Sequence, residues 1–348
     1  RYHADDYNTP AVTTGDLGAA IYMADADTGA LLWSAGKNEA TDTSEDQHDL
    51  NLPLDNSIPG DVTVADLDSD GLDDVVFAVD ILGHVWRIDI NSESSTAANF
   101  AKNENVNGVD TGAEIADLSD STVLRRFYVG PTVSLSQKRG REPFFVITVG
   151  SGHMSNPKET DISDRLYAIF EYSVFNPPTD ADGDISYTKI SAVNNDLRDM
   201  SSPSADPADP TTNAPHGFFR DAFDDGEKFL RPALTLFGYT LYTSYLPEGN
   251  GGNVETTCGS SYLGGGRLYA IDFVTGKSVY VSNYVDLSHP GIPPQPIALF
   301  IPDDEGKTRT VLCVGTECFG EEDPENPPEK NPLPSPGIYK EYWRENKQ

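Results

Sequence analysis

The sequence predicts an all-β fold, and three observations lead to that prediction. The chain has 30 Gly and 25 Pro among its 348 residues, which interrupts it too often for long helices. Its hydrophobic content of 37%, with 16 Tyr and 15 Phe, is too high for a disordered chain and low for a helical one. The apolar residues also occur in short alternating runs, which is the pattern typical of β-strands.

A short phrase recurs along the chain. It consists of an aliphatic residue, an aromatic residue, any residue and a second aliphatic or small residue. Its four copies begin at Ile21, Val85, Leu166 and Leu268. Alternation places the aliphatic side chains on one face of a strand, and two of the copies run into a Thr-Gly pair that favours a tight turn. We therefore expect each copy to be one strand of a small antiparallel sheet.

Further strands are predicted between these phrases, at Val75–Val79, Phe144–Val149 and Thr240–Tyr245. Repeated groups of short antiparallel strands are typical of a β-propeller, whose blades repeat every ~40–50 residues. The aromatic positions of the four phrases are spaced by 64, 81 and 102 residues, so the blades must carry insertions or degenerate blades must lie between them. The clearest insertion covers about residues 174–216, a segment rich in Asp, Pro, Ser and Asn that offers little to bury.

The predicted domain organisation is a propeller over residues 1–320 and a Pro/Glu-rich tail over 321–348. Four blades are clear and a fifth is indicated at Val311–Gly315, which is short of a closed ring, so we expect part of a longer propeller that is incomplete at its N-terminus. Three cysteines are too few for a disulfide framework. Because Cys258 and Cys318 are expected in loops and Cys313 in an apolar strand, the sequence favours a Cys258–Cys318 bridge.

The charge of the chain excludes several kinds of partner. It has 24 Lys and Arg against 56 Asp and Glu, a formal net charge of −32. Nucleic acids and anionic membrane surfaces are bound through basic residues, so neither is an expected partner. No apolar stretch approaches the ~18 residues of a membrane-spanning helix, so no membrane insertion is expected. Divalent cations are the natural means of offsetting such an acidic surface.

The strongest local motif is the acidic loop Asp66-Leu67-Asp68-Ser69-Asp70-Gly71-Leu72-Asp73-Asp74. Its aspartates at positions 1, 3, 5 and 9 and its Gly at position 6 match the first nine positions of an EF-hand-type calcium loop. Ca²⁺ takes six to eight oxygen ligands, which the carboxylates and the carbonyl of position 7 can supply. The predicted ligands are Asp66, Asp68, Asp70, the Leu72 carbonyl and Asp74.

This loop differs from a true EF-hand in two respects. Position 12 is Phe77 in place of the bidentate Glu, and the flanking residues predict strands in place of helices. The alternative to a calcium site is a solvated acidic turn, which the mutual repulsion of four carboxylates disfavours. A second cluster, Asp180, Asp182 and Asp184, has its Gly out of register and is interpreted as a solvated loop, with a second ion left open.

Catalytic constellations are not evident in the sequence. The triplets Asp27-Thr28-Gly29 and Asp110-Thr111-Gly112 are too close together for the two lobes of an aspartic protease and are interpreted as turns. Gly150-Ser151-Gly152-His153 lacks the first Gly of a nucleophile elbow. The six histidines show no zinc-binding spacing. We therefore expect a protein that is not an enzyme.

The acidic loop and the segment that follows it resemble the C-terminal propeller of the PilC/PilY family of type IV pilus biogenesis factors and tip adhesins. That family has an Asp-rich calcium loop, a strand and then an Asp-x-x-Gly-x-Leu-Trp-Arg-x-Asp phrase, which matches Asp80–Asp89 here except for mild departures at His84 and Val85. Further matching phrases follow in the same order, at 146–152, 164–168, 217–219, 226–228 and 243–247, then at Cys258 with 264–272, and at 342–345. The resemblance therefore covers most of the chain, although the family's first blades are not found upstream of Tyr22.

The resemblance implies a quinoprotein-like propeller fold and a non-catalytic role. The protein would be exported through the periplasm and outer membrane to the cell surface, at the pilus tip. It would work with minor pilins in pilus assembly, in extension and retraction, and in twitching motility, and it would attach cells to host or abiotic surfaces. Calcium would be held by Asp66, Asp68, Asp70, Leu72 and Asp74, and filling of the loop would be sensed by a partner.

Two alternatives remain open at this point. A quinoprotein-type dehydrogenase would use the same class of propeller, but it needs tryptophan docking motifs and usually a vicinal cysteine pair, whereas this chain has three Trp and no adjacent cysteines. An integrin-like propeller would bind its ligand through several calcium loops, and only one good loop is present here.

Overall fold

The computed structural model describes residues 18–38, 48–90, 102–103, 109–137, 142–175, 177–179, 186–193, 195–247, 263–302 and 308–319. Within these ranges the chain forms strands and turns and contains no helix, which confirms the all-β prediction. Accordingly, no helix in the described ranges is long and apolar enough to span a membrane.

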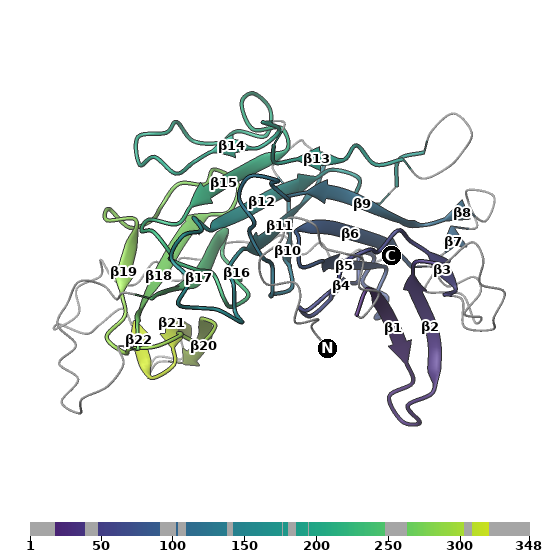
Figure 1. The fold of residues 1–348 in the computed structure, drawn as a ribbon, viewed down its shortest axis with the longest axis horizontal. Helices are drawn as coiled ribbons and strands as arrows, with labels where there is room; N and C mark the ends of the chain where they lie inside the picture. The colour runs from purple at the N-terminus through teal and green to yellow at the C-terminus, as the bar shows by residue number, and fades with distance from the viewer. Residues whose placement is uncertain are drawn as a thin grey trace.

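Five sheets of three to five strands follow one another along the described chain (Figure 1). The first sheet has the order β1-β2-β3 and the second the order β13-β9-β6-β5-β4. The strands of these two sheets are β1 (Ala20–Ala24), β2 (Leu31–Gly36), β3 (Leu50–Asn51), β4 (Thr63–Ala65), β5 (Val75–Val79), β6 (His84–Asp89), β9 (Gly112–Asp117) and β13 (Ile190–Ser191). A separate two-stranded ribbon consists of β7 (Lys102–Asn103) and β8 (Val109–Asp110).

The remaining three sheets have the orders β10-β11-β12-β15-β14, β16-β17-β18-β19 and β20-β21-β22. The strands of the third sheet are β10 (Thr132–Ser136), β11 (Phe144–Gly150), β12 (Arg165–Glu171), β14 (Arg198–Asp199) and β15 (Gly217–Asp221). Those of the fourth and fifth sheets are β16 (Leu234–Leu236), β17 (Tyr239–Leu246), β18 (Gly265–Asp272), β19 (Tyr284–Asp286), β20 (Ile297–Pro302), β21 (Thr308–Val314) and β22 (Glu317–Phe319).

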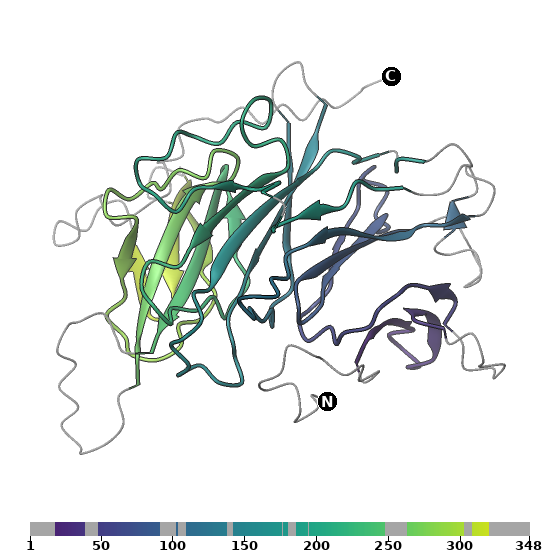
Figure 2. The same cartoon turned by 45° about the horizontal axis from the view of Figure 1, so that its top comes forward.

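The five sheets succeed one another along an arc. In Figure 1 the arc runs from the purple first sheet at the right, over the teal third sheet, to the yellow-green fifth sheet at the lower left, and Figure 2 shows the same succession from a second direction. The first and fifth sheets lie at opposite ends, so the described residues do not close a ring. Each of the four recurring phrases lies in a different sheet, and the expected fifth group at Val311–Gly315 covers the end of β21 and the start of its turn into β22 in the fifth sheet.

The hydrophobic core consists of one layer between each pair of neighbouring sheets. Phe145 and Ile147 of β11 pack toward the second sheet against Phe77, whereas Phe144 and Val146 pack toward the fourth sheet in the cluster that contains Tyr242. Successive side chains of this strand therefore belong to two different core layers. This explains why the central strands read as continuous apolar runs: both of their faces are interior.

Two of the recurring phrases end in the same turn. Asp25 accepts hydrogen bonds through its side chain from Thr28, and its carbonyl accepts one from the Gly29 N–H. Asp272 stands in the same relation to Thr275 and Gly276. Gly29 and Gly276 have φ angles of 71° and 68°, a left-handed conformation that favours glycine. The turn chemistry predicted for the Thr-Gly pairs is thus present, with an aspartate three residues before Thr as its organiser.

The described residues of the insertion contribute two short strands to neighbouring sheets. Its short strand β13 pairs in parallel with β9, and β14 pairs in parallel with β15. Ile190, Leu197 and Met200 are buried in the cores beside these strands. The few apolar residues of this segment therefore lie where the chain crosses the sheets.

The buried arginine of β6, Arg87, pairs with a carboxylate of its own strand. The guanidinium of Arg87 is fully buried, donates to Asp89 at 2.6 Å, and lies over the rings of Phe77, Phe145 and Tyr187. The guanidinium also donates to the Ser173 carbonyl at 2.6 Å. Burying a charge without such partners is very costly, so the Asp of the Arg-x-Asp phrase supplies one of the partners that the buried Arg87 needs.

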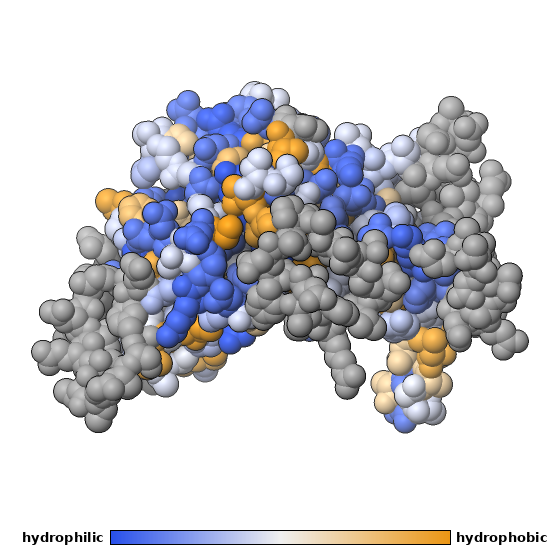
Figure 3. Space-filling model, viewed as in Figure 1, coloured by the Kyte–Doolittle hydropathy of each residue, from blue (hydrophilic) through white to orange (hydrophobic). Residues whose placement is uncertain are grey.

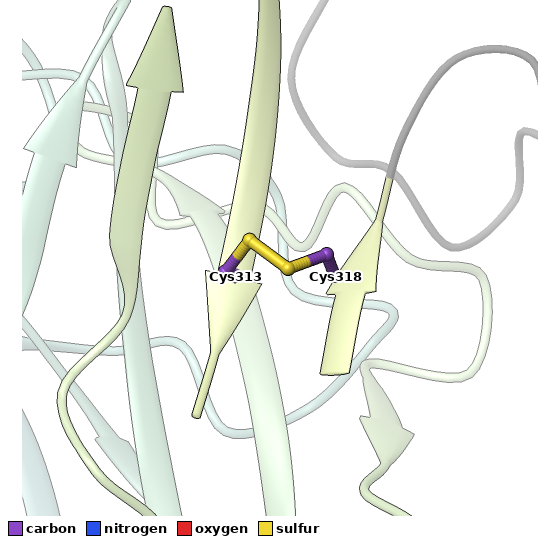
Figure 4. Close-up of a disulfide and its surroundings, with 2 residues drawn as sticks. All are labelled: Cys313 and Cys318. Atoms are coloured by element: carbon purple, nitrogen blue, oxygen red, sulfur yellow. A yellow bond between two sulfur atoms is a disulfide. The ribbon is translucent and has the colours of Figure 1, made fainter. Parts of the chain in front are cut away.

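The disulfide lies between Cys313 of β21 and Cys318 of β22, which are directly opposite in the ladder (Figure 4). The expected Cys258–Cys318 bridge was therefore wrong, and Cys258 lies outside the described residues. The reason is the two-residue turn Gly315-Thr316, which folds β22 back on β21 and brings residues five apart to a Cα separation of 4.0 Å.

On the face seen in Figure 3, hydrophilic residues alternate with apolar patches among the described residues. Apolar side chains gather on the hairpin β1–β2 at the end of the arc, where Tyr22, Leu31 and Leu32 are exposed. At the other end, β20 exposes Ile297, Leu299 and Phe300.

Candidate metal centre

The acidic loop closes the hairpin between β4 and β5. Ala65 and Val75 are paired across the hairpin, and the Asp74 N–H donates to the Ala65 carbonyl at 2.9 Å. The nine residues from Asp66 to Asp74 thus form one loop anchored by a ladder at both of its ends.

The loop is organised by its own aspartates. Both carboxylate oxygens of Asp66 accept backbone hydrogen bonds, from Ser69 at 2.7 Å and Gly71 at 2.9 Å. Asp68 accepts one from Asp70 at 3.0 Å, and Asp74 accepts one from Leu67 at 2.6 Å. Short polar side chains that bond to backbone N–H groups a few residues away stabilise tight turns.

Three of the four predicted carboxylates converge. One oxygen each from Asp66, Asp68 and Asp74 lies within 4.8 Å of the others. Asp70 is outside this group, and its Oδ1 accepts a hydrogen bond from the Leu72 N–H at 2.8 Å. The side chain of Leu72 is exposed, so this residue could contribute to a cation site through its carbonyl alone.

The loop backbone has the shape that an inward-facing set of carboxylates requires. Gly71 has a φ of 92°, a conformation that favours glycine, and Ser69 has a φ of 66°. All the donor atoms that converge are oxygens, the ligands that a hard cation such as Ca²⁺ takes. The residues present fit such an ion, with Asp66, Asp68 and Asp74 as the carboxylates closest to one another.

Sequence reasoning missed a second group of residues that could hold a metal ion. His84 of β6 lies beside Glu114 and Asp117 of β9, with one ligand atom of each within 4.8 Å of the others. Burial by itself lowers the pKa of His84, but the hydrogen bond and charge of Asp80 and the charges of Asp117 and Glu114 raise it above its ordinary value. His84 is 30 or more positions from Glu114 and Asp117 in the sequence, and it meets them through strand pairing, which no spacing motif reveals.

The other motifs considered in the sequence have structural roles where they are described. Ser151 is fully buried, donates to Asp164 at 2.6 Å and accepts from the Arg165 N–H, so its hydroxyl ties β11 to the start of β12. Asp180, Asp182 and Asp184 lie outside the described residues.

The arc of sheets and the acidic hairpin loop together define an open, propeller-like β-domain with a candidate cation site. Comparison with solved structures finds a similar fold in the crystal structure of the Pseudomonas aeruginosa PilY1 C-terminal domain. The TM-score is 0.57 and the sequence identity 15%, and the match covers 90% of this chain and 67% of that chain. The chain therefore has a PilY1-like fold. No protein-family model matches the sequence, and no curated protein matches it.

Proposed function

We propose that this protein is a type IV pilus-associated factor whose propeller-like domain acts without catalysis. The observation that carries the proposal is the likeness to the PilY1 C-terminal domain over 90% of the chain. The family phrases found in the sequence support it, because they run in the same order over most of the chain.

In this proposal the protein acts at the cell surface, at the pilus tip. Its partners are minor pilins and the host or abiotic surface to which the cell attaches, and its role is in pilus assembly, extension and retraction, and twitching. The formal net charge of −32 is compatible with exposure outside the cell.

The acidic loop is proposed to bind Ca²⁺. Asp66, Asp68 and Asp74 would supply carboxylates directly, Asp70 would rotate away from the Leu72 N–H or act through water, and the Leu72 carbonyl would complete the set. The ion would neutralise carboxylates that otherwise repel one another, and it would fix the loop that ends the edge hairpin β4–β5.

The test of the pilus assignment is genetic. The gene is deleted in its source organism and complemented with the wild-type gene, with Asp68→Asn/Asp74→Asn, or with Asp73→Asn, which changes an exposed loop carboxylate outside the converging group. Loss of surface pili on deletion, restored by the wild type and by Asp73→Asn, supports the proposal. Normal piliation and twitching after deletion would overturn it.

Calcium binding is tested separately on the purified protein. Isothermal titration should give one site in the wild type and in Asp73→Asn, and none in Asp68→Asn/Asp74→Asn. Because an ion that binds the folded state stabilises it by mass action, saturation should raise the melting temperature of the first two proteins only. No binding at millimolar calcium, or binding that survives the double substitution, would show that the loop is only an acidic turn.

A further inference from the structure

His84 is held in one orientation by a buried carboxylate. Asp80 is fully buried, and its Oδ1 accepts hydrogen bonds from the backbone N–H groups of Leu82, Gly83 and His84, each at 3.0 Å. Its Oδ2 accepts from Asn56 at 3.0 Å and lies 2.6 Å from His84 Nδ1. Because a carboxylate surrounded by donors acts as an acceptor, the hydrogen bonding assigns a proton to Nδ1. Nε2 then lies on the side of the imidazole ring away from Asp80.

A β-bulge brings two carboxylates to that side. Val85 pairs with Ala116 and Trp86 with Glu114, so Ile115 is an extra residue in β9. Ile115 and Ala116 both enter the core between the second and third sheets. Glu114 and Asp117, which regular alternation would place on opposite faces, therefore share the face of His84. Bulges commonly re-aim side chains in this way beside functional sites.

The hydrogen bonding of these residues is uneven: Asp117 Oδ1 accepts from the Ser119 N–H at 3.0 Å and from the Ser119 hydroxyl at 2.5 Å, whereas other ligand atoms have fewer partners. His84 Nε2 lies 3.7 Å from Asp117 Oδ1, which is beyond hydrogen-bonding distance. Glu114 Oε1 is shielded from solvent and has no hydrogen-bond partner among the described residues. An enclosed carboxylate oxygen without a donor is costly, and a cation placed between it and Nε2 would remove that cost.

We propose that His84, Glu114 and Asp117 bind a divalent transition metal of the Zn²⁺ class. An imidazole with two carboxylates suits Zn²⁺, whereas Ca²⁺ takes oxygen ligands, so this site and the acidic loop select different ions. Asp80 is the positioning residue, because a carboxylate that holds the other nitrogen fixes the orientation of a metal-binding histidine. His84 and Asp117 are partly exposed, which leaves an entry path and room for water.

Lys189 would compete with the metal for Glu114 and Asp117. It precedes β13, and its Nζ lies 3.3 Å from Glu114 Oε2 and 4.0 Å from Asp117 Oδ2. Its side chain is 48% exposed, so it can turn into solvent when the metal enters. Metal binding would then break the contact of Lys189, in the insertion, with Glu114 of the second sheet. In its place the metal would link His84 to Glu114 and Asp117 within that sheet.

The experiment is a zinc titration by calorimetry on the full chain, with the acidic loop saturated by calcium. We expect one zinc site in the wild type, its loss in His84→Gln and Glu114→Gln, and tighter binding in Lys189→Met. His153→Gln is the matched control for adventitious histidine binding and should bind like the wild type. The loop variant Asp68→Asn/Asp74→Asn should also retain the zinc site, which separates this proposal from the calcium site.

Melting curves in the presence of a chelator show whether each variant is folded. Should His84→Gln fail to fold, the visible absorption of Co²⁺ bound to the wild type and its change in Asp117→Asn report on the same ligands. No zinc binding below millimolar concentration, binding unaffected by His84→Gln, or binding abolished by the loop variant would each overturn the proposal.

Discussion

At the residue scale, Asp164 shows how one buried carboxyl group sets a pH dependence. It is almost fully buried at the start of β12, and its Oδ2 has no hydrogen-bond partner among the described residues. Burial raises its pKa to about 6, although the Ser151 hydroxyl and the positive charge of Lys228, 3.9 Å away, favour the ionised form.

Stability should therefore decrease as the pH rises through this range. The folded-state pKa of about 6 lies above the unfolded value near 4, so the folded protein binds more protons between these values and loses stability as they dissociate. Asp164→Asn removes this dependence. The free energy of unfolding of the wild type, relative to this variant, should fall by up to about 3 kcal/mol between pH 4 and pH 7.

Urea unfolding at a series of pH values checks this prediction, with the exposed Asp161→Asn as the baseline for a carboxylate in the same segment. Parallel profiles for the wild type and Asp164→Asn would contradict it. The hydrogen bond from Ser151 to Asp164 also explains the Gly-Ser-Gly motif. The serine is placed to donate to Asp164 and has no exposed hydroxyl with which to attack a substrate.

At the element scale, the pairing of β12 with β15 depends on one glycine. Gly217 is the first residue of β15 after the insertion, and it has a φ of 113°. A Cβ at this position would overlap the carbonyl oxygen of Ala168 in β12. Both the backbone conformation and the space therefore require glycine where the insertion returns to the third sheet.

Gly217→Ala should lower the free energy of unfolding by about 4 kcal/mol or more, because it combines a strained backbone with a backbone clash. Gly29→Ala is the matched control: its φ is 71°, and an added Cβ meets no atom within 4 Å. The control should cost only about 1 kcal/mol, the price of a left-handed conformation alone. Similar urea midpoints for the two variants would refute the structural explanation.

The central strands could be predicted from the sequence, but their connections could not. Val75–Val79 was expected from its apolar run and coincides with β5, and Phe144–Val149 falls within β11. The two-residue strands β13 and β14 carry too few residues for any periodicity to show. The predicted disulfide was wrong because the two-residue turn Gly315-Thr316, which places Cys313 opposite Cys318, was not recognised in the sequence.

The two candidate sites also differ in how well the sequence predicts them. The acidic loop is local, so the spacing of its aspartates predicts which carboxylates converge, apart from Asp70. The cluster at His84 depends on the extra residue Ile115 in β9 and on the register of β6 with β9. A bulge moves side chains between faces without leaving a signal in the sequence pattern.

At the scale of the whole molecule, the described sheets form an arc in which each core layer joins two neighbours. The third sheet has such a layer on both of its faces. The first and fifth sheets each contribute to one layer and expose apolar residues of β1, β2 and β20. Assemblies built from nearest-neighbour contacts have their lowest local stability at the ends.

Hydrogen exchange should therefore follow position in the arc. Amides of β11 and β12 should exchange slowest, and those of β1, β2 and β20–β22 fastest, because opening an end sheet disrupts one core layer and opening the third sheet disrupts two. Exchange followed by mass spectrometry at peptide resolution measures this order. Equal protection of the third and terminal sheets would show that the molecule opens as a single cooperative unit.

The two-sided burial of the central strands also determines which positions of this molecule can accept substitutions during evolution. A strand such as β11, buried along its whole length, has no solvent-facing position at which a substitution is neutral, so a change there requires a compensating change in one of two cores. Turns and sheet edges carry no such constraint. New binding specificities can therefore arise in the loops of this architecture while its layered frame is retained.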